Sequence, residues 1–136
     1  LFPYTTLFRS NDSMPEYVLE KIAKIMQEKG VTDPGRVGLY GLTYKENVDD
    51  FRESPTLQLL DYQKSHLAEP LKVFDPWIKN DIVKNQYHDF EAFLKDIDIV
   101  VIMVKHSHIK DNMELLNGKI IMDCCHICDL PGCYHL

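Results

Sequence analysis

Residues 97–104 read IDIVVIMV, and this stretch decides the fold class. Apart from Asp98 every position is apolar, and the valine and isoleucine that predominate are the residues that β-strands favour. A strand that is apolar on both faces is typical of the middle of a parallel sheet, which helices cover on each side. The stretch therefore predicts a central, buried strand of an α/β domain.

Helices and shorter strands alternate on the N-terminal side of this strand. Apolar residues recur at helical spacing across residues 15–29, and residues 36–40 (RVGLY) read as a short buried strand that Gly41 ends. A second helix is predicted from residue 55 to about residue 64, with Pro at its first position, and residues 71–74 read as a second short strand. The chain thus alternates strand and helix before it reaches residue 97.

The same alternation continues around and beyond the central strand. Phe90, Phe93 and Leu94 predict a helix just before it, residues 109–116 a weaker helix after it, and residues 119–122 a last strand. Such alternation is typical of a doubly wound, Rossmann-like α/β domain with a parallel sheet and right-handed crossovers. A ligand crevice is expected at the carboxyl ends of the strands.

Length and composition exclude several classes of function. The chain has 136 residues, which is enough for one domain with a hydrophobic core, and it is 45% apolar and 26% charged. A net charge of -6 opposes non-specific binding to nucleic acid, so any phosphate site must be local. No apolar run approaches the roughly 18 residues that span a bilayer. We expect neither a nucleic-acid partner nor insertion into a membrane.

The first ten residues need an explanation of their own. Residues 1–10 (LFPYTTLFRS) lack the basic start and the sustained apolar stretch of a targeting segment. Their back-translation resembles a common sequencing adapter read in frame, which predicts a library artefact and a natural reading frame that continues upstream of Asn11. A natural tail is the alternative.

The loop after the first predicted strand carries most of the potential chemistry. Residues 41–55 read GLTYKENVDDFRESP. Gly41 would let the backbone approach a ligand, the helix start at residues 54–55 offers unpaired N–H groups, and Lys45 and Arg52 could neutralise a diphosphate. The spacing suggests a ligand site without specifying the ligand, since a lone glycine in such a loop is usually only a turn.

This loop closely resembles the signature of the UDP-glucose and UDP-N-acetylhexosamine 6-dehydrogenases, within the UDP-glucose/GDP-mannose dehydrogenase family. Residues 11–18 (NDSMPEYV), 73–76 (VFDP) and 105–107 (KHS) resemble further segments of the same proteins, so the resemblance extends from residue 11 to about residue 135. The valine and paired aspartates before Arg52 are more similar to the N-acetylhexosamine branch than to the UDP-glucose branch, which stays as an alternative.

The resemblance implies a division of the chain and a partner for it. Residues 11–30 would be the linking α-helix from the central dimerisation region, and residues 31–136 the C-terminal UDP-binding domain, with a complete and a truncated C-terminal edge as the alternatives. The ligand would be a UDP-sugar. The full-length protein would be a cytoplasmic homodimer that pairs through the helix at residues 15–29.

The same resemblance assigns roles to single residues. Lys45 matches the lysine that contacts the UDP-sugar, and Arg52 matches the arginine that reaches the NAD cofactor held by the other domain. Tyr44 either packs against the nucleotide or fills the loop, and His106 matches a histidine of the crevice. Gly41 completes the predicted site.

Simple structural roles compete with chemical roles at Arg52 and at the two aspartates before it. Arg52 could instead pair with Glu53 or Asp49, because surface ion pairs of this kind are common. Asp49 and Asp50 look like a general acid/base pair, yet the side chains of adjacent loop residues normally diverge. We therefore interpret the two aspartates as solvated residues that shape the loop.

The family oxidises a primary alcohol to a carboxylate by two NAD-dependent hydride transfers, with a cysteine that holds the intermediates. No cysteine precedes Cys124 and no G-x-G-x-x-G motif occurs in the chain. We therefore expect no catalytic residue here, an NAD site mainly in another domain, and no activity from this chain alone.

All four cysteines lie near the C-terminus, at positions 124, 125, 128 and 133, with His126 and His135 among them. Such ligands can form a zinc site. However, zinc clusters usually bring two well-separated pairs, so we predict free, reduced thiols and no metal. The family usually has a basic residue at the position of Cys125, and its absence here predicts either weaker ligand binding or a different subfamily.

Two other classes of function remain as alternatives to a UDP-sugar domain. A flavodoxin-like phosphoacceptor domain could use Asp49, Asp50, Asp75 and Lys105, but residues 41–43 (GLT) stand where its magnesium-binding acids belong. A zinc-dependent interaction module could use the C-terminal cysteines. Neither alternative explains residues 41–55. Trp77 could stack on a uracil ring or lie half-buried at a domain interface, and we favour the second role.

Overall fold

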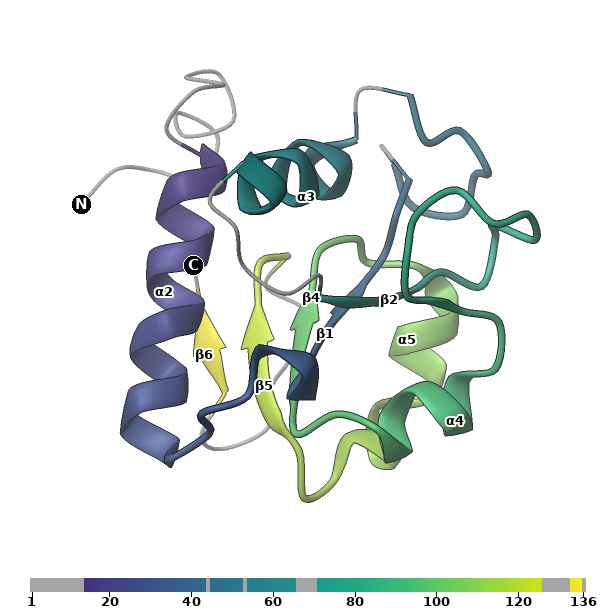
Figure 1. The fold of residues 1–136 in the computed structure, drawn as a ribbon. Helices are drawn as coiled ribbons and strands as arrows, with labels where there is room; N and C mark the ends of the chain where they lie inside the picture. Colours follow the sequence, from purple (N-terminus) through teal and green to yellow (C-terminus); the bar gives the residue numbers. More distant parts are fainter. Residues whose placement is uncertain (1–13, 44, 53, 66–70, 126–132, 136) are drawn as a thin grey trace.

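The computed structural model describes residues 14–43, 45–52, 54–65, 71–125 and 133–135 (Figure 1). They form a parallel sheet of six strands with helices around it. In chain order the elements are α2 (Met14–Lys29), η1 (Pro34–Arg36), β1 (Val37–Tyr40), α3 (Pro55–Ser65), β2 (Lys72–Phe74), β3 (Gln86–Tyr87), α4 (Phe90–Lys95), β4 (Ile99–Ile102), α5 (Ser107–Asp111), η2 (Met113–Leu116), β5 (Ile120–Asp123) and β6 (Tyr134–His135).

The strand order is β3-β2-β1-β4-β5-β6, so the order reverses between β1 and β4. These two strands lie side by side in parallel register, with Leu39 opposite Val101 and Tyr40 opposite Ile102. This is the arrangement of the doubly wound dinucleotide-binding folds, whose ligands bind outside the carboxyl ends of the strands where the order reverses. The predicted fold class is confirmed.

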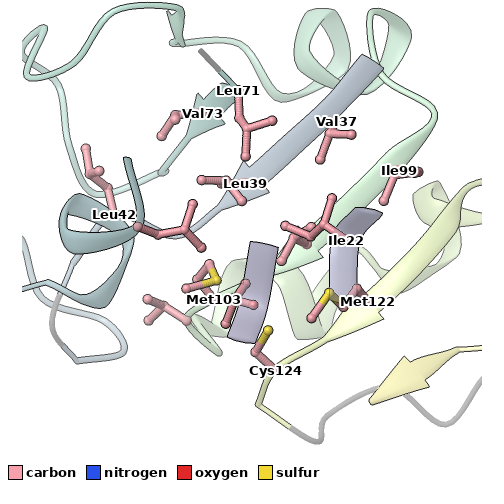
Figure 2. Close-up of a cluster of buried hydrophobic side chains, with 14 of the residues drawn as sticks. Ile22, Val37, Leu39, Leu42, Leu71, Val73, Ile99, Met103, Met122 and Cys124 are labelled. Carbon is pink, nitrogen blue, oxygen red and sulfur yellow. The ribbon is translucent and has the colours of Figure 1, made fainter. Parts of the chain in front are cut away.

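The two faces of the central strand explain why its sequence is apolar throughout. Ile99 and Val101 pack into one buried cluster together with residues of α2 and α3, and Val100 and Ile102 pack into a second cluster with residues of α4 and α5. Figure 2 shows the first cluster, where Ile22 of α2 faces the sheet. Each fully buried aliphatic side chain contributes about 1.5 to 3 kcal/mol. Hydrophobic burial on both faces therefore fixes β4 at the centre.

Helix α2 belongs to this same core. Val18, Ile22 and Ile25 on its inner face are all buried, and the helix packs against α3. It ends at Gly30, whose φ of +72° is the left-handed conformation that glycine favours after a helix. Residues 1–13, including the predicted adapter-derived segment, lie outside the described residues. None of the helices in the described part is long and apolar enough to cross a membrane.

The structure corrects the predicted elements in three places. The strand predicted at residues 97–104 contains only Ile99–Ile102, because its paired neighbour β1 is itself four residues long. The helix predicted at residues 109–116 is two short helices that break at Asn112, whose φ of -124° leaves the helical region. The edge strands β3 and β6, of two residues each, were not predicted.

Candidate ligand-binding site

The carboxyl ends of β1 and β4 bring together several residues that the sequence singled out. The loop after β1 begins at Gly41, the residues that follow β4 include Lys105 and His106, and Asp75 follows β2. Because all three strands are parallel, their carboxyl ends meet at one edge of the sheet. We refer to this edge as the carboxyl edge.

Gly41 turns the chain out of β1 under tight packing. Its φ is +103°, and a Cβ at this position would lie 2.7 Å from the Val104 Cβ and 2.8 Å from the Val104 backbone nitrogen. Its N–H donates to the Phe74 carbonyl (2.9 Å), and its own carbonyl accepts from the Thr56 hydroxyl (2.6 Å). The side chain and backbone of Val104, which follows β4, therefore already require glycine here.

Asp75 is a buried carboxylate that accepts hydrogen bonds from three donors. Its Oδ2 accepts from the Leu42 N–H (2.6 Å) and from His106 Nε2 (2.9 Å), and its Oδ1 accepts from the Trp77 N–H (2.7 Å). The residue is only 2% exposed. Burial of a charged group is costly unless hydrogen bonds compensate for the lost water, and here three donors do so.

His106 lies beside Asp75 with its side chain fully buried, and both of its ring nitrogens are engaged. The Asn47 N–H donates to Nδ1 (2.8 Å), so Nδ1 carries no proton and Nε2 carries the hydrogen. The Thr43 hydroxyl agrees with this tautomer, because it donates to the Lys45 carbonyl (2.7 Å) and can therefore only accept from Nε2 (3.3 Å). His106 is thus neutral, and its contact with Asp75 is a hydrogen bond to a carboxylate rather than an ion pair.

Asn47 connects the loop after β1 to the turn after β4 through its side chain as well. Its Oδ1 accepts from the Ser107 N–H (2.9 Å) and its Nδ2 donates to the Ser107 hydroxyl (2.9 Å). Its φ of +59° lies in the left-handed region, which asparagine tolerates better than most residues. We use the name clasp for Thr43, Asn47, Asp75, His106 and Ser107.

Lys45 is exposed on the segment that the clasp holds. Among the described residues, no carboxylate lies within ion-pairing distance of its ammonium group. Lys105, at the end of β4, is a second exposed cation at the same edge. The carboxyl edge thus has two exposed lysines in a chain whose net charge is -6.

Arg52 is exposed and pairs with Asp50 through two hydrogen bonds of 3.0 Å each. Asp50 was not among the predicted alternative partners, which were Asp49 and Glu53. The pairing with Glu53 stays a prediction. The Arg52 guanidinium lowers the pKa of Asp50 to about 2. Glu53 and Tyr44 lie outside the described residues, and Asp49 is solvated.

Trp77 is 44% exposed, and its backbone N–H is held by Asp75. The side chain therefore stands near the carboxyl edge, partly in contact with solvent. The two roles considered for Trp77, stacking on a base and burial at a domain interface, both stay predictions.

The C-terminal cysteines differ from one another. Burial raises the pKa of the Cys124 thiol, and burial together with Asp123 raises the pKa of Cys125 to about 12, so both thiols are protonated. Cys133 is disulfide-bonded, and the prediction of four free thiols is therefore wrong at this position. No three potential metal ligands gather within the described residues, and His126 and Cys128 are not among these.

Sequence reasoning missed the roles of Asp75 and Asn47. Asp75 was named only within the VFDP segment of the resemblance and as an acid of the phosphoacceptor alternative, and Asn47 was given no role. A buried aspartate that accepts three hydrogen bonds has no room for the magnesium that a phosphoacceptor needs. The contacts of these two residues are seen only where the three strand ends meet, because no local sequence pattern predicts them.

The strand order and the cation-bearing loop at the point of reversal together define a nucleotide-binding type of α/β domain. The family model for the UDP-glucose/GDP-mannose dehydrogenase family, UDP binding domain, matches residues 38–130. The chain belongs to this family.

Similar proteins agree with this assignment. The chain is 32% identical over 121 residues to the UDP-N-acetyl-D-mannosamine dehydrogenase of Methanococcus aeolicus, and 29% identical over 106 residues to the UDP-N-acetyl-D-glucosamine 6-dehydrogenase of Salmonella typhi. These matches cover 83% and 75% of this chain, but only 27% and 25% of the respective relatives. The chain thus spans about a quarter of the length of these relatives.

A solved structure shares the same fold. The UDP-N-acetyl-mannosamine dehydrogenase of Staphylococcus aureus superimposes with a TM-score of 0.71 at 28% identity, over 91% of this chain and 31% of that protein. The resemblance to the family that the sequence indicated is therefore confirmed by a family model, by sequence relatives and by structure.

Proposed function

We propose that this domain binds a UDP-N-acetylhexosamine at the carboxyl edge, and that Lys45 makes the principal charged contact with the UDP-sugar. The observation that carries this proposal is the exposed Lys45 at the point where the strand order reverses. The buried Thr43 and His106 hold the backbone at Lys45 and Asn47. Helix and strand ends at such a reversal are the usual place for a nucleotide. The alternative substrate is UDP-glucose, which would use the same contact to the nucleotide.

Local charge supports the assignment to Lys45. The net charge of the chain is -6, so an anionic diphosphate is repelled by the molecule as a whole and needs a nearby cation. Lys45 has no competing carboxylate partner among the described residues, and Lys105 adds a second charge at the same edge. Tyr44 is proposed to pack against the nucleotide, while Gly41 and His106 shape the site.

Arg52 is proposed to contact the NAD cofactor from this domain. Its present partner Asp50 is exposed, and exposed ion pairs are weak because water and salt screen them. Exchange of the Asp50 carboxylate for a cofactor phosphate would therefore cost little. The guanidinium also presents two parallel donors, which suits a phosphate as well as a carboxylate.

The whole enzyme is proposed to oxidise the UDP-sugar at C6 in two NAD-dependent hydride transfers and to work as a homodimer. NAD would be bound mainly by a different domain, which would also supply the catalytic cysteine. The names of the N-acetylmannosamine and N-acetylglucosamine relatives support the N-acetylhexosamine branch. We expect the 136-residue chain by itself to bind the UDP-sugar but not to oxidise it.

Isothermal calorimetry on the purified chain tests the binding proposal. UDP-N-acetylglucosamine, UDP-N-acetylmannosamine, UDP-glucose and ATP would be titrated into the wild type, Lys45→Ala and the control Lys24→Ala, which removes an exposed lysine of α2. We expect UDP-sugars to bind and ATP not to bind. Loss of a hydrogen bond to a charged group should weaken binding by Lys45→Ala about tenfold or more.

Lys24→Ala should bind as the wild type does. A folded wild type that ignores every UDP-sugar, or that binds ATP equally well, contradicts the proposal.

A further inference from the structure

We propose that the clasp is a positioning device for Lys45, in which the buried His106 and the loop residue Asn47 determine UDP-sugar affinity without touching the ligand. This inference rests on the proposed function, since it concerns how the same site is held. The His106 side chain is fully buried beneath the loop, so it acts through the residues that it holds.

The first argument is that the backbone is anchored at Lys45 itself and again at Asn47. The Thr43 hydroxyl holds the Lys45 carbonyl, and His106 Nδ1 holds the Asn47 N–H two residues further along. Thr43 and His106 are both fully buried, so the loop is pinned to the protein interior. Ordering a residue on binding costs backbone entropy. A loop that is already ordered does not pay this cost when the ligand binds.

The second argument concerns the N-terminus of helix α5. His106 occupies the N-cap position of this helix but makes no side-chain capping hydrogen bond. Asn47 instead supplies an acceptor from the other loop for one of the unpaired N–H groups of this helix end, because its Oδ1 receives the N–H of Ser107, the first residue of α5. The left-handed backbone of Asn47 places its amide group in this position. Asn47 therefore both fixes the loop that carries Lys45 and contacts the N-terminus of α5.

The third argument is that Asp75 orients the histidine. It accepts the Nε2 hydrogen of His106, and this leaves Nδ1 as the acceptor that the Asn47 N–H requires. Asp75 is itself held by the N–H groups of Leu42 and Trp77. The chain of contacts thus runs from the end of β2, through the end of β4, to the loop after β1. A change at His106 should reach Lys45 by this route.

The experiment compares three substitutions and one matched control on the purified chain. His106→Leu removes both ring contacts, whereas His106→Gln retains one donor and one acceptor on an amide. Asn47→Gly keeps the left-handed backbone and the N–H that His106 holds but loses both contacts with Ser107. Asn85→Gly is the control, since Asn85 has a similar φ of +63° and lies in the connection before β3.

Calorimetry with UDP gives the affinity, and amide hydrogen exchange at Asn47 reports the clasp directly. We expect His106→Leu to weaken UDP binding about tenfold and to speed exchange at Asn47, and His106→Gln to restore most of the affinity. Asn47→Gly should weaken binding several-fold, and Asn85→Gly should leave it unchanged. Thermal melts on each variant ensure that only folded protein is compared.

Three results would overturn the inference in distinguishable ways. If the wild type binds UDP and both His106→Leu and Asn47→Gly bind it equally well while folded, the clasp has no positioning role and the proposed function stands. If His106→Gln is as weak as His106→Leu although its fold is intact, specific hydrogen bonding is not responsible. If the folded wild type does not bind UDP at all, the proposed function fails, and the inference fails with it.

Discussion

The two ends of the sheet both join strands through a charged side chain, but in opposite surroundings. At the carboxyl edge Asp75 meets His106 with neither side chain exposed. At the other end, which we name the amino edge, Arg36 just before β1 donates two hydrogen bonds to Asp98 just before β4, at 3.1 and 2.9 Å. The side chains of this second pair are 39% and 46% exposed.

The comparison shows that exposure to water, rather than the geometry of the contact, determines how much the protein is destabilised when one partner is lost. The Arg36 guanidinium lowers the pKa of Asp98, yet solvent screens the pair and can replace either partner. Buried groups have no such replacement, so loss of one partner leaves the others unsatisfied. The amino edge also has an open hollow of about 580 Å³ that Lys29, Arg36 and Asp98 help to line. The buried network, and not this hollow, distinguishes the edge where we expect the ligand.

Loss of the buried carboxylate should have the largest effect on stability. Asp75→Ala would leave the N–H groups of Leu42 and Trp77 and the His106 Nε2 hydrogen without their acceptor. The free energy of unfolding should fall by about 3 to 5 kcal/mol, because three buried donors lose their acceptor at about 1 to 3 kcal/mol each. Urea denaturation followed by circular dichroism measures the change. A loss below about 1 kcal/mol would show that the network is not needed for folding.

A pair of glycine substitutions should give the next largest difference between the edges. Gly41→Ala combines a positive φ with contacts of 2.7 and 2.8 Å to Val104, and should cost about 2 to 4 kcal/mol. Gly118→Ala, just before β5, has a φ of +87° with nothing within 4 Å of the new Cβ, and should cost about 1 kcal/mol. Thermal unfolding of both variants measures the difference. Equal costs would mean that Gly41 is required only for its backbone conformation.

The smallest effect is expected at the exposed pair of the amino edge. Arg36→Met and Asp98→Asn should each shift the urea midpoint only slightly, and the double variant should show a weak coupling that added salt reduces further. A double-mutant cycle at low and high salt measures this coupling. A coupling that matches the effect of Asp75→Ala, or that salt leaves unchanged, would remove the contrast between the two edges.

Much of the fold could be predicted because its signals are local. The apolar run at residues 97–104 marked the central strand, and helical spacing marked α2 and α3. The edge strands β3 and β6 escaped prediction because two residues are too few to show a pattern. The disulfide at Cys133 escaped prediction because free, reduced thiols are the expectation for a cytosolic protein.

The site was predicted only in part, and for a physical reason. Lys45 stood out by its charge and by the resemblance of its loop, and the structure places it exposed at the carboxyl edge. His106 was predicted as a crevice residue, but the structure shows that it is buried under the loop. Its contacts with Asp75 and Asn47 join residues 31 and 59 positions apart in the sequence. Such contacts depend on the register of parallel strands, which no single segment specifies.

An NMR titration with UDP tests the central claim most directly, because it observes both edges in one sample. Backbone amide signals of the purified, isotope-labelled chain would be followed as UDP is added. We expect shifts at Lys45, Asn47 and Ser107 on the carboxyl edge, and unchanged signals at Arg36 and Asp98 on the amino edge. Shifts that gather at the amino edge, or no shifts at all in a folded sample, would contradict the account.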